Sequence, residues 1–291
     1  MFAGKGGVGK TTCAAATALH YDSLGKQTLA ISTDPTPSLS HIFEATQRQK
    51  PTMVSRNLYL DEIGVDEVKE MWDSKFGREV YEVFSSFVAI EYEEFIDFII
   101  SILPGMRDEF MVDYIREVVM GNEYEKVVWD TAPLGQTLGL LKMPAMLAQH
   151  LKTAPRIYSK LKTGRASKKP VMDVIKGWED LSGRNMDFLR GKVEFVIITI
   201  PEALAVEQLN DIFGEFAEYG LKIDRLVINN VIKDTSSDFL RIKAEQQRGY
   251  TEFLRDSYQG LRIIELPMFS REIKGVDRLK DIQSKLFQET N

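Results

Sequence analysis

Residues 4–12 carry the clearest chemical signal in the chain, because they read Gly-Lys-Gly-Gly-Val-Gly-Lys-Thr-Thr and match G-x-x-x-x-G-K-[ST] at every fixed position. Glycines allow successive backbone N–H groups to point at phosphate oxygens, and a helix that starts at the end of the loop directs its positive dipole end at the same anion. A helix-forming run at 13–19 follows, which disfavours a glycine-rich turn without a ligand. The sequence predicts a nucleotide-binding loop made of Gly4, Lys5, Gly6, Gly7, Val8, Gly9, Lys10, Thr11 and Thr12.

Three side chains of this loop have distinct predicted roles. Lys10 has the length to reach the β- and γ-phosphates, and the Thr11 hydroxyl is placed to ligate Mg²⁺. Lys5 leaves the loop early and projects away from phosphates that its own chain binds. In the deviant-loop class of ATPases, which this loop resembles, that lysine contacts nucleotide across a homodimer interface. Lys5 therefore favours an ATPase that works as a face-to-face dimer, the alternative being a solvated lysine.

Two aspartates end or follow apolar runs. Asp34 lies in Ser-Thr-Asp-Pro at 32–35, where a carboxylate can orient or activate the water that attacks the γ-phosphorus, although an Asp before Pro also starts turns. Asp130 ends Val-Val-Trp-Asp at 127–130, the pattern of a carboxylate that supports Mg²⁺. Because phosphoryl transfer depends on positioning and charge stabilisation, we predict Asp34, Lys5 and Lys10 as catalytic, and Thr11 and Asp130 as metal-binding.

Polar and apolar residues at two later strand ends are candidates for binding the base. Asn229 closes the run 225–229, and its amide can give and take one hydrogen bond with adenine, the alternative being a turn asparagine. Pro267, Met268 and Phe269 follow the last predicted strand, where they pack against adenine or form a plain loop. Ligands of open α/β sheets bind beyond the carboxyl ends of the strands, so we expect these residues beside the phosphate loop.

Short apolar, β-branched runs alternate with helical patterns along the chain. This alternation predicts an α/β fold with a doubly wound, mostly parallel sheet of about seven or eight strands. The predicted strands cover 1–3, 27–33, 58–62, 126–131, 192–199, 225–229 and 261–266.

One ATPase domain is predicted over 1–291, with an α-helical subdomain inserted at about 65–120 and 144–190. The first insertion is acidic and too long for one crossover helix, and the second is basic in its first half. One expected helix places Val68, Trp72, Phe76, Val80, Val83, Phe84 and Phe87 at helical spacing, and another, after Pro104-Gly105, carries Met106, Phe110, Met111, Tyr114, Ile115 and Val118. Ordinary helix packing and a solvated basic surface are the alternatives to a functional role.

Composition excludes several classes of function. The chain has 291 residues and a net charge of −6, which disfavours general nucleic-acid binding. Cys13 is the single cysteine, so one chain holds neither an internal disulfide nor a thiolate zinc site, as suits a reducing cytoplasm. The apolar region 87–103 is interrupted by acids and no leader is visible, so we expect no membrane-spanning segment. The first strand begins at Met1, which suggests missing residues in front or a misassigned start.

Taken in order, these pieces resemble the ArsA/GET-pathway ATPase family over nearly the whole chain. That family includes the arsenite-pump ATPase and the cytosolic factor that delivers tail-anchored membrane proteins. The matching segments are the deviant loop at 4–12, a first switch (Ser-Thr-Asp-Pro-Thr-Pro-Ser-Leu-Ser) at 32–40, a helical Pro-Gly motif at 103–109, a second switch (Asp-Thr-Ala-Pro-Leu-Gly-Gln-Thr-Leu) at 130–138, and later nucleotide contacts at 200–203 and 266–269.

The resemblance implies ATP and Mg²⁺ as cofactors and gives roles to single residues. Lys5 would contact the nucleotide of the partner subunit, Asp34 would position the attacking water, and Asp130 would support the metal and the second switch. Asn229 would contact adenine, and Glu202 would lie near the nucleotide across the dimer. Closure of the homodimer would reshape the helical subdomain, which in targeting factors forms an apolar groove for transmembrane segments of clients; a membrane receptor is a further implied partner.

The chain departs from the family pattern at several positions. Pro37 and Gln136 stand where members often have histidine, which alters the expected coupling between the switches. The cysteines that hold zinc in targeting factors, and those that bind arsenite in the pump, are absent. The leading prediction is a targeting factor for hydrophobic helices. The alternatives are an arsenite-pump subunit and an ATP-gated binding module with little turnover, whereas the helical insertions disfavour a partitioning or positioning ATPase.

Overall fold

The structure is a computed structural model that describes residues 1–34, 36, 38–46, 50–78, 81–82, 85, 91–96, 104–132 and 171–288. The chain divides into two compact units. The first consists of Met1–Glu62, Gly121–Thr137 and Val193–Asn291, and the second of Ile63–Met120 and Leu138–Lys192.

Within the described residues, the first unit holds an eight-stranded sheet in the order β3-β4-β2-β5-β1-β6-β7-β8. Every neighbouring pair is parallel except β3 and β4 at one edge. The strands are β1 Phe2–Gly4, β2 Thr28–Ser32, β3 Thr52–Met53, β4 Leu58–Glu62, β5 Lys126–Asp130, β6 Phe195–Thr199, β7 Ile223–Val231 and β8 Arg262–Pro267. The predicted α/β class with a mostly parallel sheet is confirmed.

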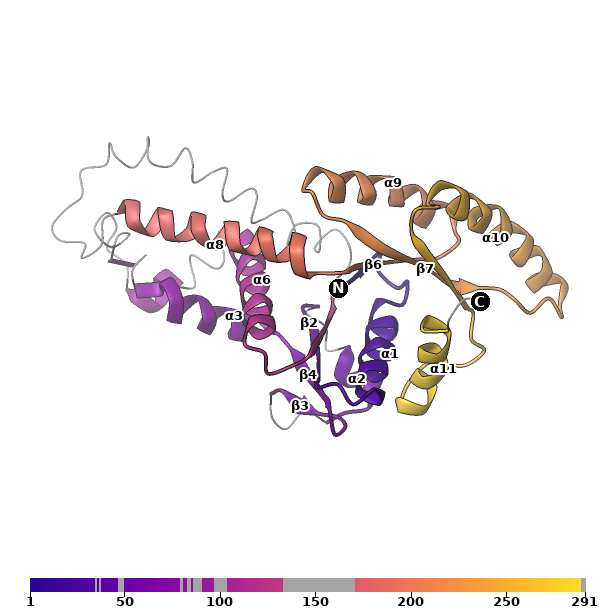
Figure 1. Ribbon diagram of the computed structural model, residues 1–291, viewed down its shortest axis with the longest axis horizontal. Helices are drawn as coiled ribbons and strands as arrows, with labels where there is room; N and C mark the ends of the chain where they lie inside the picture. Colours follow the sequence, from indigo (N-terminus) through magenta and orange to yellow (C-terminus); the bar gives the residue numbers. More distant parts are fainter. Residues whose placement is uncertain are drawn as a thin grey trace. The chain divides into compact units, whose positions relative to one another are not determined.

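Helices cover both faces of this sheet (Figure 1). One face carries α1 (Lys10–Ser23), α2 (Leu39–Phe43) and α11 (Val276–Leu286), and the other carries α9 (Ala203–Glu218) and α10 (Asp238–Ser257). Strand β6 shows why both faces must be covered, because its side chains are buried on alternate sides. Val196 and Ile198 belong to the core that contains α1 and α11, whereas the Phe195 ring meets Phe216 of α9 at 5.1 Å between centroids.

The second unit is mainly helical in its described residues. It contains α3 (Val65–Trp72), the π-helical turn η1 (Asp73–Gly77), α6 (Pro104–Met120) and α8 (Val171–Lys192). The predicted stripe that starts at Val68 passes from α3 into η1, where the hydrogen-bond spacing changes. The later members of that stripe, Val80, Val83, Phe84 and Phe87, lie outside the described residues, as does the 144–170 part of the predicted subdomain.

Apolar burial and one ion-pair network hold the second unit together. Helix α6 begins at Pro104, where the sequence predicts a new helix, and its Phe110, Met111, Val112 and Ile115 are at most 3% exposed. Asp113, only 1% exposed, pairs with Lys75 of η1 at 2.5 Å and with Arg116. The Arg116 Nε donates to Asn185 Oδ1 of α8 at 2.9 Å, so polar contacts join three helical elements.

None of the helices within the described ranges combines the length and the apolar character that crossing a membrane requires.

Candidate phosphate-binding site

The loop predicted to bind phosphate joins the central strand β1 to α1. Strand β1 lies between β5 and β6, the position from which the sheet extends in both directions, and such a switch point opens a crevice at the carboxyl ends of the strands. Close neighbours leave no room for a side chain at two of the loop glycines, Gly4 and Gly9. A Cβ on Gly4 would stand 2.3 Å from the Ile198 carbonyl oxygen, and Gly9 has φ +99° and would place a Cβ 2.4 Å from Asn229 Nδ2.

Lys10 is a buried cation at the start of α1. Its residue is 6% exposed, and its ammonium donates to the Lys5 carbonyl oxygen at 3.0 Å, so it bends back across the loop. Burial lowers the pKa of Lys10, while the carboxylates of Asp130 and Asp34 act in the opposite direction. The loop therefore holds a positive charge between two acidic groups, where a phosphate can compete for it.

Asp130 forms the acidic centre of the site at the end of β5. Its Oδ2 accepts from the Thr11 hydroxyl at 2.9 Å and from the Ser38 hydroxyl at 3.4 Å. The side chain is fully buried, and burial raises the pKa of Asp130 to about 6, against the lowering effect of the Thr11 hydrogen bond and of Lys10. Its Oδ1 is buried without a hydrogen-bond partner within the described residues, so one acceptor is left for an ion or water.

These residues fit the Mg²⁺ that the phosphate loop implies. A hydroxyl from Thr11 and a carboxylate from Asp130 are hard oxygen donors, and Mg²⁺ uses few protein ligands beside water and substrate phosphates. The unpartnered Asp130 Oδ1 supplies the acceptor that metal-bound water requires. Bound Mg²⁺ would neutralise phosphate charge, and the chain's own residues would hold the ion in place.

Asp34 follows β2 in the same neighbourhood. Its Oδ1 accepts from the Thr36 amide at 2.9 Å, and its own amide donates to Ser32 Oγ at 3.2 Å. A buried chain of contacts ties this turn to β5, because the Trp129 indole donates to Thr33 Oγ1 at 3.1 Å and the Thr33 amide donates to the Asp130 carbonyl at 3.1 Å. The two aspartates thus belong to one framework.

Asn229 contacts the loop from β7. Its Nδ2 donates one N–H to the Val8 carbonyl at 2.8 Å, which leaves Oδ1 as an acceptor and the second N–H as a donor toward a base. The adenine contact of this residue stays a prediction, and the structure shows that Asn229 supports the loop.

The remaining residues predicted to contact nucleotide differ in their exposure and in what they contact. Glu202 is exposed at the start of α9, and the Lys5 side chain is half-buried. The Met268 amide donates to the Val231 carbonyl at 2.9 Å and its side chain is 45% exposed, whereas Phe269 packs against the core. Pro37 and Gln136, the two departures from the family pattern, lie outside the described residues.

Two residues next to the site were missed by sequence reasoning. Ser38 contacts Asp130, and Glu62, the last residue of β4, accepts from the backbone where α2 begins. A signal existed for both residues. Ser38 lies in the segment that resembles the first switch, and Glu62 is a carboxylate at the end of a predicted strand, as Asp130 is.

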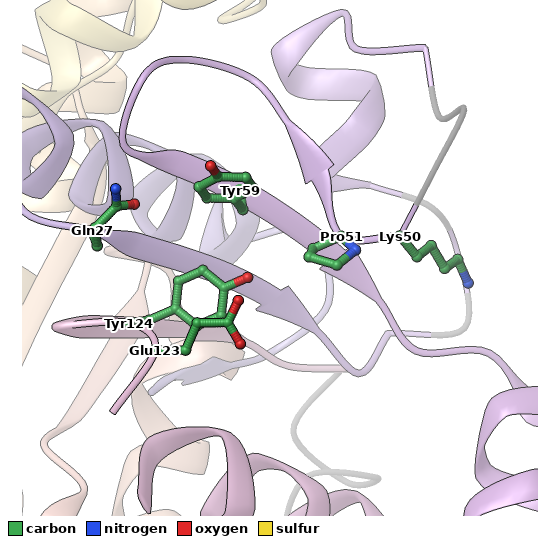
Figure 2. Close-up of a pocket in the computed structure, with 6 residues that line it drawn as sticks. All are labelled: Gln27, Lys50, Pro51, Tyr59, Glu123 and Tyr124. Atoms are coloured by element: carbon green, nitrogen blue, oxygen red, sulfur yellow. The ribbon is translucent and has the colours of Figure 1, made fainter. Parts of the chain in front are cut away.

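A separate hollow of about 670 Å³ lies at the other end of the strands from the phosphate loop. Its lining residues are Gln27, Lys50, Pro51, Tyr59, Glu123 and Tyr124 (Figure 2). Gln27 and Tyr124 precede β2 and β5, so the hollow lies at the amino ends of these parallel strands. It is therefore distinct from the phosphate loop, which follows the carboxyl end of β1.

Comparison with known proteins agrees with this geometry. Residues 1–288 match the family of anion-transporting ATPases. The chain is 30% identical over 297 residues to a candidate arsenical pump-driving ATPase of Aquifex aeolicus, with 98% of each chain covered. It is 29% identical to a candidate arsenical pump-driving ATPase of Prosthecochloris vibrioformis, over 100% of this chain and 75% of that protein. It is 28% identical to ATPase GET3A of Arabidopsis thaliana, over 97% of this chain and 81% of that protein.

The match extends over the phosphate loop, the strands that carry both aspartates and the helical unit. It confirms the predicted resemblance to the ArsA/GET-pathway proteins. The chain belongs to the anion-transporting ATPase family and is an ATPase.

Proposed function

We propose that this ATPase hydrolyses ATP with Mg²⁺ at the loop 4–12, and that hydrolysis drives the handling of hydrophobic helices by a homodimer. The proposed hydrolysis rests on one observation: Lys10, Thr11, Asp34 and Asp130 interact at the carboxyl ends of the central strands. Lys10 stabilises phosphate charge, Thr11 and Asp130 hold the metal, and Asp34 orients the attacking water.

The dimer is proposed from Lys5. Its backbone carbonyl accepts from the Lys10 ammonium, and its own side chain takes no part in that contact and is half-buried. In a face-to-face dimer the Lys5 ammonium would reach the nucleotide of the partner subunit and complete its charge stabilisation. ATP would then hold two subunits together, and hydrolysis would release them.

Hydrophobic segments of client proteins are the proposed cargo, and GET3A among the relatives supports this class. The helical unit supplies apolar helices, but α6 already buries Phe110, Met111 and Ile115. Among the residues of this unit whose side-chain burial is described, Met120 is a large apolar side chain with substantial exposure, at 51%. The proposal therefore requires α6 to release its apolar face, or other residues to form the client surface, when the dimer closes. The single cysteine supports a cytoplasmic location.

A pump-driving role is the second candidate, because two of the relatives carry that name. Direct arsenite binding requires several thiolates, and this chain offers Cys13 alone. Cys13 is fully buried, and burial raises its pKa to about 12, so the thiolate form is disfavoured. A pump-driving role would need a different anion site.

One set of assays separates these functions. We expect Mg²⁺-dependent ATP hydrolysis that arsenite does not stimulate, and capture of a tail-anchored segment that depends on ATP. Stimulation by arsenite without capture would favour the pump role. An Asp34→Asn variant distinguishes hydrolysis from an ATP-gated module with little turnover, since equal slow rates for both proteins would refute the role of Asp34.

A further inference from the structure

Helix α2 begins at Leu39 directly after Ser38, a residue type that normally caps the helix it precedes. A capping serine accepts a hydrogen bond from a backbone N–H in the first turn. Ser38 makes no such bond, and its hydroxyl lies 3.4 Å from Asp130 Oδ2. The start of α2 must therefore be satisfied by another group.

Glu62 is that group. Its Oε1 accepts from the Leu39 amide at 2.8 Å and from the Ser40 amide at 3.2 Å. Glu62 is 7% exposed and Leu39 is fully buried, so these hydrogen bonds to a carboxylate are shielded from water. Charge-assisted bonds of this kind are stronger than those of a neutral serine hydroxyl, and the negative charge also suits the positive end of the helix.

We propose that Glu62 is a positioning residue for ATP hydrolysis, because it caps α2 in place of Ser38 and so leaves the Ser38 hydroxyl on Asp130. Ser38 and Thr11 then share Oδ2 of the same carboxylate, and the end of the segment that starts at Asp34 is fixed. In this proposal Glu62 acts on the reaction through Ser38 and α2. The inference rests on the proposed hydrolytic role of Asp34 and Asp130.

A double-mutant cycle tests this coupling. Glu62→Ala is expected to lower kcat about tenfold while KM and the Kd for ADP stay within about twofold, since misplacement of catalytic groups acts on the rate. Ser38→Ala is expected to lower kcat by a similar factor. The double variant should be no slower than the slower single variant, because both substitutions remove the same contact. Multiplied losses in the double variant would overturn the inference.

Two conservative variants keep the test independent of folding. Glu62→Gln retains an acceptor oxygen and should keep at least about half of kcat, whereas Glu62→Asp retains the charge but withdraws it from the two amides and should lose at least about threefold. A lower Tm in Glu62→Asp or Glu62→Ala with unchanged kcat would assign Glu62 a merely structural role and contradict the proposal.

A crystal structure of the Glu62→Ala variant gives a readout that needs no activity. We expect the Ser38 hydroxyl to leave Asp130 and cap α2 itself; a serine that stays on Asp130 would refute the inference. A wild-type protein without ATPase activity would instead contradict the proposed function, while this structural readout would still decide the role of Glu62.

Discussion

At the scale of single residues, the site combines the buried ammonium of Lys10 and the buried carboxylate of Asp130 with the half-buried carboxylate of Asp34. Lys10 and Asp130 both have their pKa shifted toward the neutral form, and burial is the largest cause in each case. The unpartnered Asp130 Oδ1 adds a polar group that nothing in the described protein satisfies. Such an arrangement costs folding stability and is expected where a ligand supplies the missing interactions.

The pH dependence of stability follows from Asp130. Its pKa rises to about 6 in the folded protein, so the native state keeps a proton that the unfolded chain releases near pH 4. This contribution is present below about pH 4 and is lost as the pH rises through about 6, with a total of about 3 kcal/mol. In the presence of a chelator, wild type should therefore lose more stability than Asp130→Asn between pH 4 and 7.5.

Thermal unfolding of both proteins at the two pH values measures this difference. Mg²⁺ added with ADP at pH 7.5 should raise the Tm of wild type more than that of Asp130→Asn. Parallel pH profiles for the two proteins would show that Asp130 ionises normally.

Base selectivity is a second prediction at this scale. One N–H of Asn229 Nδ2 is engaged by Val8, and we expect Oδ1 to accept from the amino group of adenine, where guanine presents a carbonyl oxygen that Oδ1 would repel. Asn229→Ala should lower kcat/KM for ATP and GTP, and about tenfold more for ATP. Asn229→Asp keeps an acceptor and loses the donor to the loop, so it should weaken both nucleotides without reducing the preference for ATP. An unchanged ATP/GTP ratio in Asn229→Ala would limit this residue to loop support.

At the scale of elements, the turn between β1 and α1 depends on where a Cβ can stand. Gly7 and Gly9 both have positive φ, at +78° and +99°. A Cβ on Gly7 would meet nothing within 4 Å, whereas on Gly9 it would stand 2.4 Å from Asn229 Nδ2. A side chain at Gly7 would therefore meet backbone strain alone, whereas a side chain at Gly9 would meet both backbone strain and a steric clash.

Alanine at these two positions should have unequal effects. Gly7→Ala adds strain of about 1–2 kcal/mol, and we expect a modest loss of ADP affinity. Gly9→Ala should weaken ADP binding at least about tenfold more, because it also displaces Asn229 from the loop. Asn229→Ala should partly rescue Gly9→Ala in calorimetric titrations, since it removes the clashing amide. Equal losses for the two alanine variants would refute this role of the Gly9 contact.

Elements with continuous apolar character were predictable from the sequence, and others were not. Strand β5 occurs at 126–130, within the predicted 126–131, because a parallel strand covered on both faces is apolar through its middle, here Val127, Val128 and Trp129. Strand β3 has two residues and pairs antiparallel at the edge, which is too short to leave a pattern. The predicted strand at 192–199 begins late, at Phe195, because Lys192 ends α8.

For the candidate site too, local sequence patterns identified some residues and missed contacts between distant ones. Spacing within one segment identified the loop 4–12, and apolar runs identified Asp34 and Asp130. The link from Glu62 to α2 joins residues 22 and 23 positions apart in sequence, and no local rule places a strand-end carboxylate on a particular helix. The shift from α3 to η1 likewise depends on packing, since apolar spacing alone suits a regular helix.

At the scale of the whole molecule, the first unit, which holds the sheet and the loop 4–12, and the second, helical unit are separate compact parts of one chain. The candidate phosphate-binding site lies in the first unit, and the second contains apolar helices joined by an ion-pair network around the buried Asp113. A homodimer would give the ATP cycle a large motion to control, because nucleotide that contacts two subunits couples binding to their association.

Subunit mixing tests the central claim, that ATP is hydrolysed at a site completed by Lys5 of the partner subunit. Lys5→Met and Asp34→Asn should each be nearly inactive alone. In a mixed dimer, one site would combine Lys10 and Asp34 of the Lys5→Met subunit with Lys5 of the Asp34→Asn subunit. An equimolar mixture, in which half of the dimers are mixed and each has one intact site, should therefore recover about a quarter of the wild-type rate. A mixture that stays as inactive as its components would contradict catalysis across the dimer.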